Sequence, residues 1–200
     1  MLTVVLAILQ ARVSSTRLPR KVLKPILGVP MILRQIERIK RANCIDKLVV
    51  ATSTDSSDDE LFELCQHHEI VCLRGSLNDV LDRFYQVAIL YNPAHVVRLT
   101  GDCPLADPRI IDEVIQRHLT GQYDYTSNTI EPTYPDGLDI EIFRLACLER
   151  AWQEACLPSQ REHVTLFINQ HAELFNRGSV KNIEDLSKLR WTVDELEDFI

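Results

Sequence analysis

A cluster of basic and hydroxyl side chains lies in residues 9–30, directly after a short apolar run. Its cations are Arg12, Arg17, Arg20, Lys21 and Lys24, and its hydroxyl side chains are Ser14, Ser15 and Thr16. Guanidinium groups bind phosphate through planar, bidentate hydrogen bonds, lysine adds a point charge, and hydroxyls fill the remaining acceptors. The segment therefore predicts a loop that holds a triphosphate. A solvated basic loop that caps a helix is the alternative, but five cations beside three hydroxyls exceed what a cap needs.

Two aspartates that are far apart in the sequence could carry chemistry: Asp102 could hold a metal for that triphosphate, and Asp194 also follows a predicted short strand. Asp102 stands in Thr-Gly-Asp-Cys-Pro at 100–104, and Asp194 stands in Trp-Thr-Val-Asp at 191–194. One or two carboxylates with phosphate oxygens and water are the usual protein site for Mg²⁺. Each aspartate also has a plainer interpretation, since Asp102 could bond its own turn and Asp194 could begin a helix.

The segments that must position these residues alternate between strand and helix patterns. Buried strands are predicted at 4–9, 48–52, 70–73 and 96–99, with amphipathic helices between them. Later strands are expected at 123–127, 138–143 and 190–193, and later helices at 145–155 and 160–170, the last capped by Ser159. Helix starts are also expected at Ser57, Ser76 and Asp107-Pro108. This order predicts an α/β fold, a three-layer α/β/α sandwich with a mostly parallel sheet.

Composition and charge narrow the function classes. The chain of 200 residues is 46% hydrophobic and 26% charged, which favours one globular domain over 1–200. A net charge of −7 disfavours a nucleic-acid or membrane surface, and no apolar run approaches the length of a membrane helix. The six glycines form neither a Walker A sequence nor G-x-G-x-x-G. Six cysteines without a Cys-x-x-Cys pair indicate reduced thiols in a cytoplasmic protein.

The segments at 11–23, 98–105 and 191–198 together resemble the cytidylyltransferase family, which includes the acylneuraminate and 3-deoxy-manno-octulosonate enzymes. Stretches at 78–84, 124–128, 137–143 and 161–165 resemble its SpsF-type branch, named after a spore-coat polysaccharide protein. The resemblance implies a nucleotide-diphospho-sugar transferase (Rossmann-like) fold. It also implies that a sugar hydroxyl attacks the α-phosphorus of CTP, which gives a CMP-sugar and pyrophosphate for surface polysaccharide or glycoconjugate synthesis.

The resemblance also implies roles for individual residues. Arg12, Arg17 and Lys21 would hold the triphosphate, and Asp102 and Asp194 would hold Mg²⁺. Arg12, Lys21 and Asp102 are accordingly the candidate catalytic residues. The nucleotide would also contact Ala11, Ser14, Ser15, Thr16, Arg74 and Ser76. Residues towards the acceptor sugar would be Asn128, Asp139, Glu141 and His163.

Some assignments stay open at this point. Asp139 and Glu141 are two apart on the expected strand and so share a face, where they could bind the sugar, accept its proton or simply face solvent. The lone His163 could equally be a cap, and the loop at 129–137 could cover the substrate or only connect two strands. Family members are often dimers, and residues 129–135 could contribute to such an interface.

Two departures from the family pattern qualify the expected activity. Leu196 stands where the family commonly has proline, and the sequence ends at Ile200, where a further C-terminal helix is expected. A naturally short chain and a truncated one both fit. Two other functions therefore remain: a glycosyltransferase of related fold, although no Asp-x-Asp occurs, and a nucleotide-binding module without turnover.

Overall fold

A seven-stranded sheet forms the centre of the computed structural model, which describes residues 4–199. Its strand order is β5-β4-β1-β6-β8-β7-β9. The strands in chain order are β1 (Val5–Gln10), β4 (Lys47–Ser53), β5 (Cys72–Gly75), β6 (His95–Thr100), β7 (Tyr125–Ser127), β8 (Glu141–Arg144) and β9 (Arg177–Ser179). The first four run parallel, β8 is antiparallel to both β6 and β7, and β9 is parallel to β7. The predicted mostly parallel sheet is confirmed.

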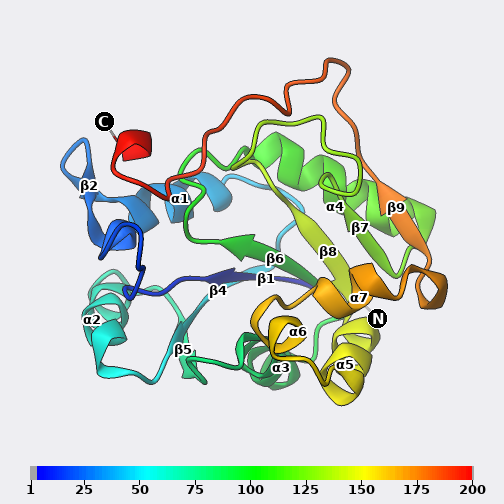
Figure 1. The fold of residues 1–200 in the computed structure, drawn as a ribbon, viewed down its shortest axis with the longest axis horizontal. Helices are drawn as coiled ribbons and strands as arrows, with labels where there is room; N and C mark the ends of the chain where they lie inside the picture. The colour runs from blue at the N-terminus through cyan, green and yellow to red at the C-terminus, as the bar shows by residue number, and fades with distance from the viewer. Residues whose placement is uncertain (1–3, 200) are drawn as a thin grey trace.

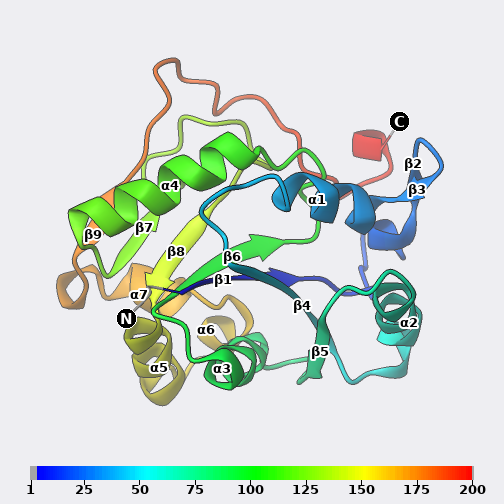
Figure 2. The ribbon, with the colours of Figure 1, turned by 180° about the vertical axis from the view of Figure 1, so that it is seen from behind.

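Helices cover both faces of this sheet, as Figures 1 and 2 show. On one face lie α1 (Met31–Ile39), α2 (Asp59–His67) and α4 (Pro108–Gly121). On the other lie α3 (Val80–Tyr91), α5 (Leu145–Glu154), α6 (Pro158–Glu162) and α7 (Leu166–Gln170). The chain thus has the predicted three-layer α/β/α architecture.

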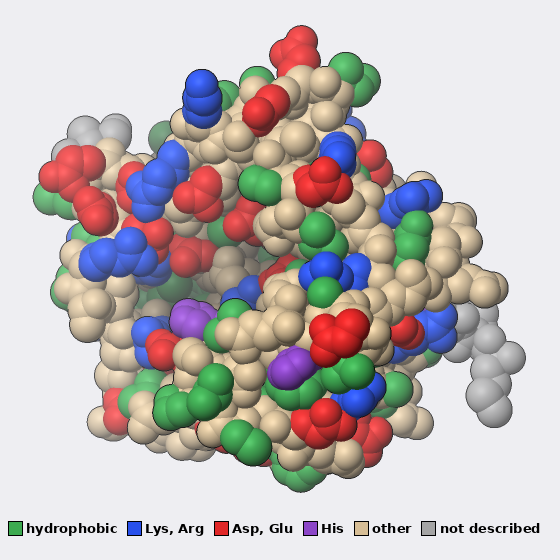
Figure 3. All heavy atoms as spheres, turned by 45° about the vertical axis from the view of Figure 1, so that its right-hand side comes forward, with side chains coloured by type: hydrophobic (Ala, Val, Ile, Leu, Met, Phe, Trp, Pro, Cys, Tyr) green, Lys and Arg blue, Asp and Glu red, His purple; other side chains and the backbone are tan. Residues whose placement is uncertain are grey.

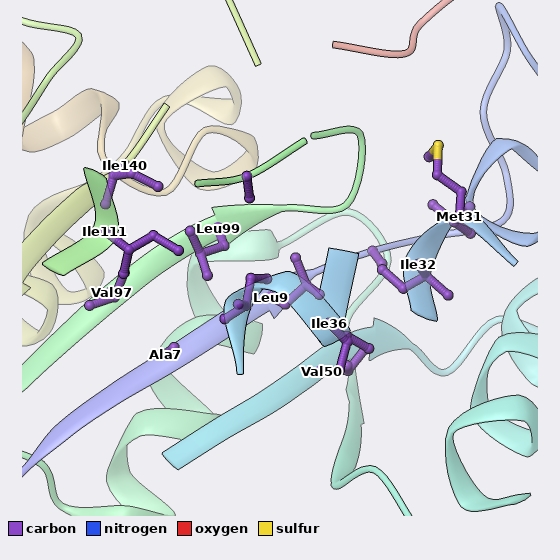
Figure 4. Packing of buried hydrophobic residues seen from close by; sticks show 14 of the residues in the cluster. Ala7, Leu9, Met31, Ile32, Ile36, Val50, Val97, Leu99, Ile111 and Ile140 are labelled. Carbon is purple, nitrogen blue, oxygen red and sulfur yellow. The ribbon is translucent and has the colours of Figure 1, made fainter. Parts of the chain in front are cut away.

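The alternation of side chains along β1 explains why both faces are apolar. Ala7 and Leu9 enter the core on the α1 side, and Leu6 and Ile8 enter the core on the α3 side, all fully buried. Figure 4 shows Leu9 packed among residues of α1 and of the neighbouring strands. A strand buried on both faces must be continuously apolar, and this is the pattern that identified it.

Several expected elements differ from the structure. The helix expected at 160–170 is split into α6 and α7, because His163 leaves the helical conformation with φ −104° and ψ 80°. Ser159 is not its cap, since Gln160 Oε1 instead accepts the N–H group of Leu157 at 3.2 Å. The segment 190–193 forms only an isolated bridge between Arg190 and Asp136, since its neighbours are loops and not strands. The sequence did not indicate β9.

Other helix starts and strand bounds also moved. Ser57 does not cap α2, because Asp55 caps the preceding short 3₁₀ turn, Ser56–Asp58, and Asp58 is buried. The predicted start at Asp107 and Pro108 is confirmed, with Asp107 accepting the Arg109 N–H. The expected strand at 138–143 begins only at Glu141, so Asp139 lies before it. The helix expected beyond Ile200 lies outside the described residues.

Candidate active site

A pocket of about 320 Å³ opens at the carboxyl ends of β1 and β6. This is the edge at which open α/β sheets bind ligands. Figure 3 shows a hollowed face of the molecule on which acidic and basic side chains lie together. The pocket is lined by residues from the predicted loop, from β1 and β6 and their ends, from α3, from the end of α6 and from the C-terminal segment.

The pocket brings together nine of the predicted site residues. They are Ala11, Arg12, Ser15, Thr16, Arg17, Lys21, Asp102, His163 and Asp194. Six others do not line it, namely Ser14, Arg74, Ser76, Asn128, Asp139 and Glu141. The loop of residues 11–21 and both aspartates therefore share one pocket, as the sequence predicts.

Hydrogen bonds with the sheet fix the predicted loop. The buried Asp58 carboxylate accepts the N–H of Val13 at 2.6 Å and the N–H of Ser53 at 3.1 Å. The N–H group of Arg20 then bonds back to the Val13 carbonyl at 3.1 Å, which closes the loop on itself. A 3₁₀ turn, η1 (Lys21–Leu23), follows and places Lys21 at the pocket. Arg20 instead points to Glu60 and forms a surface ion pair.

Asp102 and Asp194 are neighbours because their backbones are hydrogen-bonded together. The Val193 N–H donates to the carbonyl of Asp102 at 2.8 Å, and the Thr192 hydroxyl donates to the same oxygen at 3.2 Å. The N–H group of Gly101 bonds to the Gln10 carbonyl at 2.8 Å, which ties this turn to β1. A Cβ at position 101 would lie 2.9 Å from the Ala11 Cβ, so glycine permits the close approach.

Lys21 lies between the two carboxylates. Its Nζ is 2.9 Å from Asp194 Oδ1 and 3.3 Å from Asp102 Oδ2, and it also donates to the Val193 carbonyl at 2.9 Å. Desolvation acts to raise the pKa of Asp102, but the Lys21 charge and hydrogen bonds outweigh it and lower that pKa. Asp194 also accepts from Arg17 and from Arg190, each at 2.9 Å. Asp194 is therefore not a helix cap; Asp198 instead accepts the Asp194 and Glu195 N–H groups.

Most of the predicted residues outside the pocket use their polar atoms within the fold. Arg74 donates to the carbonyls of Ser53 and Asp55, at 2.8 and 2.9 Å. Asn128 is buried and clamps the turn before β8, donating to the Leu138 carbonyl and accepting the Ile140 N–H. Ser76 Oγ accepts the N–H group of Asp79 at 3.0 Å. These contacts hold the three side chains within the fold and not in the pocket.

Glu141 differs most from its expected role. It is buried, and its carboxylate is bonded to Arg98 and, at 2.6 Å, to the Tyr125 hydroxyl. Burial acts to raise the pKa of Glu141, but Arg98 and Tyr125 hold it below the usual value. Arg98 itself lines the pocket. Glu141 therefore acts on the pocket through Arg98, and the expectation of a surface shared with Asp139 on one strand is wrong.

Asp139 remains exposed on the loop before β8. Partial desolvation and the negative charges of Asp136, Glu141 and Asp102 raise the pKa of Asp139 to about 6. Eight lining residues were not selected as site residues from the sequence, and three of these are charged: Arg83, Arg98 and Glu162. Arg83 is 3% exposed, and its position inside an amphipathic helix pattern gave no signal that it reaches a pocket.

The two aspartates fit a divalent cation that takes its remaining ligands from a substrate. Among residues 4–199, no three His, Cys, Asp or Glu side chains gather in an arrangement that could hold a metal alone. Mg²⁺ commonly binds through one or two carboxylates together with phosphate oxygens and water. Three cationic side chains already surround Asp194, which shows that positive charge is stabilised at this position.

No helix within residues 4–199 combines the length and the apolar character needed to cross a membrane.

Comparison with known proteins agrees with this geometry. The sequence profile of the cytidylyltransferase family matches residues 6–198. The spore coat polysaccharide biosynthesis protein SpsF of Bacillus subtilis is 35% identical over 98% of this chain and 83% of its own. A 3-deoxy-manno-octulosonate cytidylyltransferase of Polynucleobacter necessarius is 41% identical over 68% of this chain and 53% of its own.

A solved structure of a cytidylyltransferase from Leptospira borgpetersenii superposes with a TM-score of 0.93 at 36% identity. The match covers 98% of this chain and 83% of that one. The matched residues include both ends of the site described above, the loop after β1 and the segment that carries Asp194. The chain belongs to the cytidylyltransferase family.

Proposed function

We propose that this protein transfers CMP from CTP to a hydroxyl of an acidic sugar and releases pyrophosphate, for surface polysaccharide or glycoconjugate synthesis. One observation carries the proposal: the loop cations Lys21 and Arg17 meet Asp102 and Asp194 in one pocket at the carboxyl edge of the sheet. The family supports the cytidylyl group, and the names of the SpsF and octulosonate relatives support the sugar acceptor. The free cysteines support a cytoplasmic location.

In the proposed reaction the sugar hydroxyl oxygen forms a bond with the α-phosphorus, and the bond from that phosphorus to the pyrophosphate oxygen breaks. Such transfers depend on positioning and on neutralising charge more than on covalent chemistry. Arg12, Arg17 and Lys21 would bind the phosphates and stabilise the charge that develops on pyrophosphate. Asp139 lies outside the pocket lining, on the loop before β8, and its raised pKa of about 6 makes it our candidate to accept the hydroxyl proton if the bound sugar extends to this loop.

We further propose that the enzyme depends on Mg²⁺, held by Asp102 and Asp194. The bound ion would neutralise phosphate charge during the transfer. The pair of carboxylates supports this proposal. His163, which lines the pocket at the end of α6, is our candidate contact for the acceptor sugar.

A panel assay tests the proposal. The protein is incubated with Mg²⁺, each of the four NTPs and a set of nonulosonic and octulosonic acids, and pyrophosphate is measured. Release with CTP and an acidic sugar, and not with CTP alone, is the expected result. Release of a nucleoside mono- or diphosphate from a preformed nucleotide-sugar, with no pyrophosphate from CTP, would indicate a glycosyltransferase. Tight CTP binding with no release would indicate a module without turnover.

Asp102→Asn is the matched negative control for that assay. Removing the charge of this carboxylate should abolish pyrophosphate release while the far-ultraviolet circular dichroism spectrum stays unchanged. Near-normal release from this variant would contradict the metal assignment.

A further inference from the structure

The side chain of Arg83 is a buried cation that points into the pocket without a hydrogen-bond partner. Arg83 lies on α3 and is 3% exposed, yet it lines the pocket. Its Nε and Nη1 atoms are buried and bond to nothing among the described residues. A Cβ at Gly75 would lie 2.9 Å from the Arg83 Cγ, so the absence of a side chain at position 75 makes room for this arginine.

A buried guanidinium without partners is energetically unfavourable in the ligand-free protein. Desolvation lowers the pKa of Arg83, and the Asp58 carboxylate only partly opposes this effect. Asp58 does not supply the missing hydrogen bonds: its oxygens accept from Val13 and Ser53, and none of its bonds reaches the Nε or Nη1 of Arg83. Arg98 shows the usual solution, since this second arginine of the pocket is paired with Glu141 and donates to Gln10.

Arg12 is the second unpaired cation at the same place. It lines the pocket, is exposed to solvent and forms no ion pair among residues 4–199. Its charge also acts to lower the pKa of Arg83, so the two guanidinium groups repel each other. By contrast, Lys21 and Arg17 are bonded to Asp194. Within the described part of the chain, Arg12 and Arg83 are therefore pocket cations without an ion-pair partner.

We propose that Arg83 is a nucleotide-binding residue which, together with Arg12, receives phosphate oxygens of the nucleotide. A phosphate would supply the acceptors that the buried Nε–H and Nη1–H groups lack and would remove the repulsion between the two arginines. This inference rests on the proposed function for its ligand. The structural observation is independent of that function, because it requires only an anion of phosphate chemistry.

Arg83→Met provides the main test, because methionine fills similar space without charge. An uncompensated buried charge is lost, so the ligand-free variant should melt at the same temperature as wild type or higher. Its affinity for CTP, measured by calorimetry, should fall by about 10- to 100-fold. Arg83→Lys keeps the charge but not the planar guanidinium group, so its affinity for CTP should lie between those of wild type and Arg83→Met. Arg109→Gln, which removes an exposed arginine on α4, is the control and should bind CTP as wild type does.

Binding of CTP, inorganic tripolyphosphate and cytidine shows which part of the nucleotide Arg83 contacts. Weaker binding of CTP and of inorganic tripolyphosphate, with cytidine binding unchanged, is the expected result. Equal weakening of cytidine would place Arg83 at the base or ribose and overturn the proposal. CTP affinity within twofold of wild type would overturn it as well, as would a lower melting temperature with unchanged affinity, which indicates a structural role.

The same measurements separate this inference from the proposed function. If tripolyphosphate binding depends on Arg83 but no sugar supports pyrophosphate release from CTP, the anion site stands and the proposed reaction fails. If CTP and an acidic sugar release pyrophosphate equally well in wild type and Arg83→Met at limiting CTP, the reaction stands and this inference fails.

Discussion

Lys21 Nζ lies 2.9 Å from Asp194 Oδ1, although the two residues are 173 positions apart in the chain. The lysine is also 3.3 Å from Asp102 Oδ2, so one ammonium group links the loop after β1, the turn after β6 and the C-terminal segment. The side chains of Lys21 and Asp194 are only 12% and 14% exposed. Ion pairs this sheltered depend strongly on both partners, because either charge left alone is poorly solvated.

Lys21→Met should therefore destabilise the protein and inactivate it. We expect a loss of about 1–3 kcal/mol in the free energy of unfolding at pH 7, since the carboxylates lose a shared partner. The folded-state pKa of Asp102 is lowered, so its contribution to stability is present at neutral pH and is lost as the carboxyl is protonated in acid. Urea unfolding at pH 7 and pH 4 should show the wild-type advantage shrinking at the lower pH.

Lys24→Met is the control for this variant, because Lys24 belongs to the same loop and forms no ion pair within the part of the chain that the structure describes. It should unfold within about 0.5 kcal/mol of wild type. A stability loss in Lys24→Met equal to that of Lys21→Met would show that the loop, and not the ion pairs, is responsible.

Mg²⁺ should stabilise the Lys21→Met variant more than wild type. Removing the ammonium leaves Asp102 and Asp194 with less compensating charge, so a divalent cation competes with fewer protein groups for them. Melting temperatures measured from zero to about 20 mM MgCl₂ should rise further in the variant than in wild type. The double variant with Asp102→Asn should lose this extra shift, and equal shifts in all proteins would contradict a metal site at these carboxylates.

Gly137 should be needed for the position of Asp194. Its φ is +104°, and a Cβ there would lie 2.5 Å from the Thr192 nitrogen, within the segment that bonds to the Asp102 carbonyl. Gly137→Ala should displace this segment and reduce the rate of pyrophosphate release by at least about tenfold. It should also destabilise the fold by more than the roughly 1 kcal/mol that a left-handed alanine costs by itself.

Gly28→Ala is a matched control for Gly137→Ala. Gly28 has a similar positive φ of +78°, but nothing lies within 4 Å of the position of a Cβ. It belongs to the turn between the short strands β2 (Pro25–Ile26) and β3 (Val29–Pro30). The strain is thus comparable while the clash is absent, and activity should stay near that of wild type. Equal activity losses in the two variants would show that the clash with Thr192 is not the cause of the loss in Gly137→Ala.

Asp58→Asn should weaken nucleotide binding by loosening the phosphate loop. The Asp58 carboxylate accepts the Val13 N–H at 2.6 Å, and an amide nitrogen placed there would face donors. We expect a stability loss of about 1–3 kcal/mol and a rise in KM for CTP, with a smaller effect on kcat. Asp46→Asn is the control, since Asp46 accepts the Val5 N–H at 2.7 Å at the other end of β1. It should lose stability without changing KM.

The sequence predicted the parallel half of the sheet, and the part of the site that follows β1 and β6, for one reason. Each buried strand is a continuous apolar run, and the functional residues stand just after β1 and β6, so a parallel sheet must bring them to one edge. The placement of Asp194 beside them came from the resemblance, because 190–193 forms no strand that could have fixed it. The hydrogen bonds from Val193 and Thr192 to Asp102 are long-range contacts without a local pattern.

Burial explains the residues whose expected positions differ. The resemblance implied that Glu141 and Asn128 lie towards the acceptor, yet both are buried with their atoms engaged in the fold. The sequence pattern does not distinguish Arg83 from other charged residues of amphipathic helices, which are usually solvated. Polarity in a sequence does not show whether a side chain meets solvent, a protein partner or a ligand, since this depends on the packing of distant segments.

A buried histidine pair should make the protein less stable in mild acid. His95 Nδ1 lies 2.9 Å from His118 Nε2, and His118 Nδ1 lies 3.0 Å from Thr126 Oγ1, all within the core between α4 and the sheet. Desolvation, with smaller effects of His95 and Arg144, lowers the pKa of His118 to about 3. Desolvation also lowers the pKa of His95. Both rings are therefore neutral in the folded protein near neutral pH.

The sign of the effect follows from comparing the two states. The unfolded chain protonates these histidines near their ordinary pKa of about 6.5, while the folded protein does not. The folded protein therefore binds fewer protons than the unfolded chain between about pH 3 and 6.5. Stability is thus fully present above about pH 6.5 and falls by up to about 1.4 kcal/mol per pH unit for each such histidine below it. Urea midpoints from pH 7.5 to pH 5 should decrease accordingly, beyond any change from the carboxylates.

Substitution separates this pair from the other titrating groups. His118→Gln keeps a hydrogen-bonding side chain that does not titrate, so its urea midpoint should fall less steeply between pH 7 and pH 5 than that of wild type. His67→Gln removes an exposed histidine on α2 and should leave the wild-type slope unchanged. The unfolded chain of His118→Gln binds one proton fewer in that range. If the variant nevertheless retained the full slope, the acid sensitivity would have to come from groups other than His118.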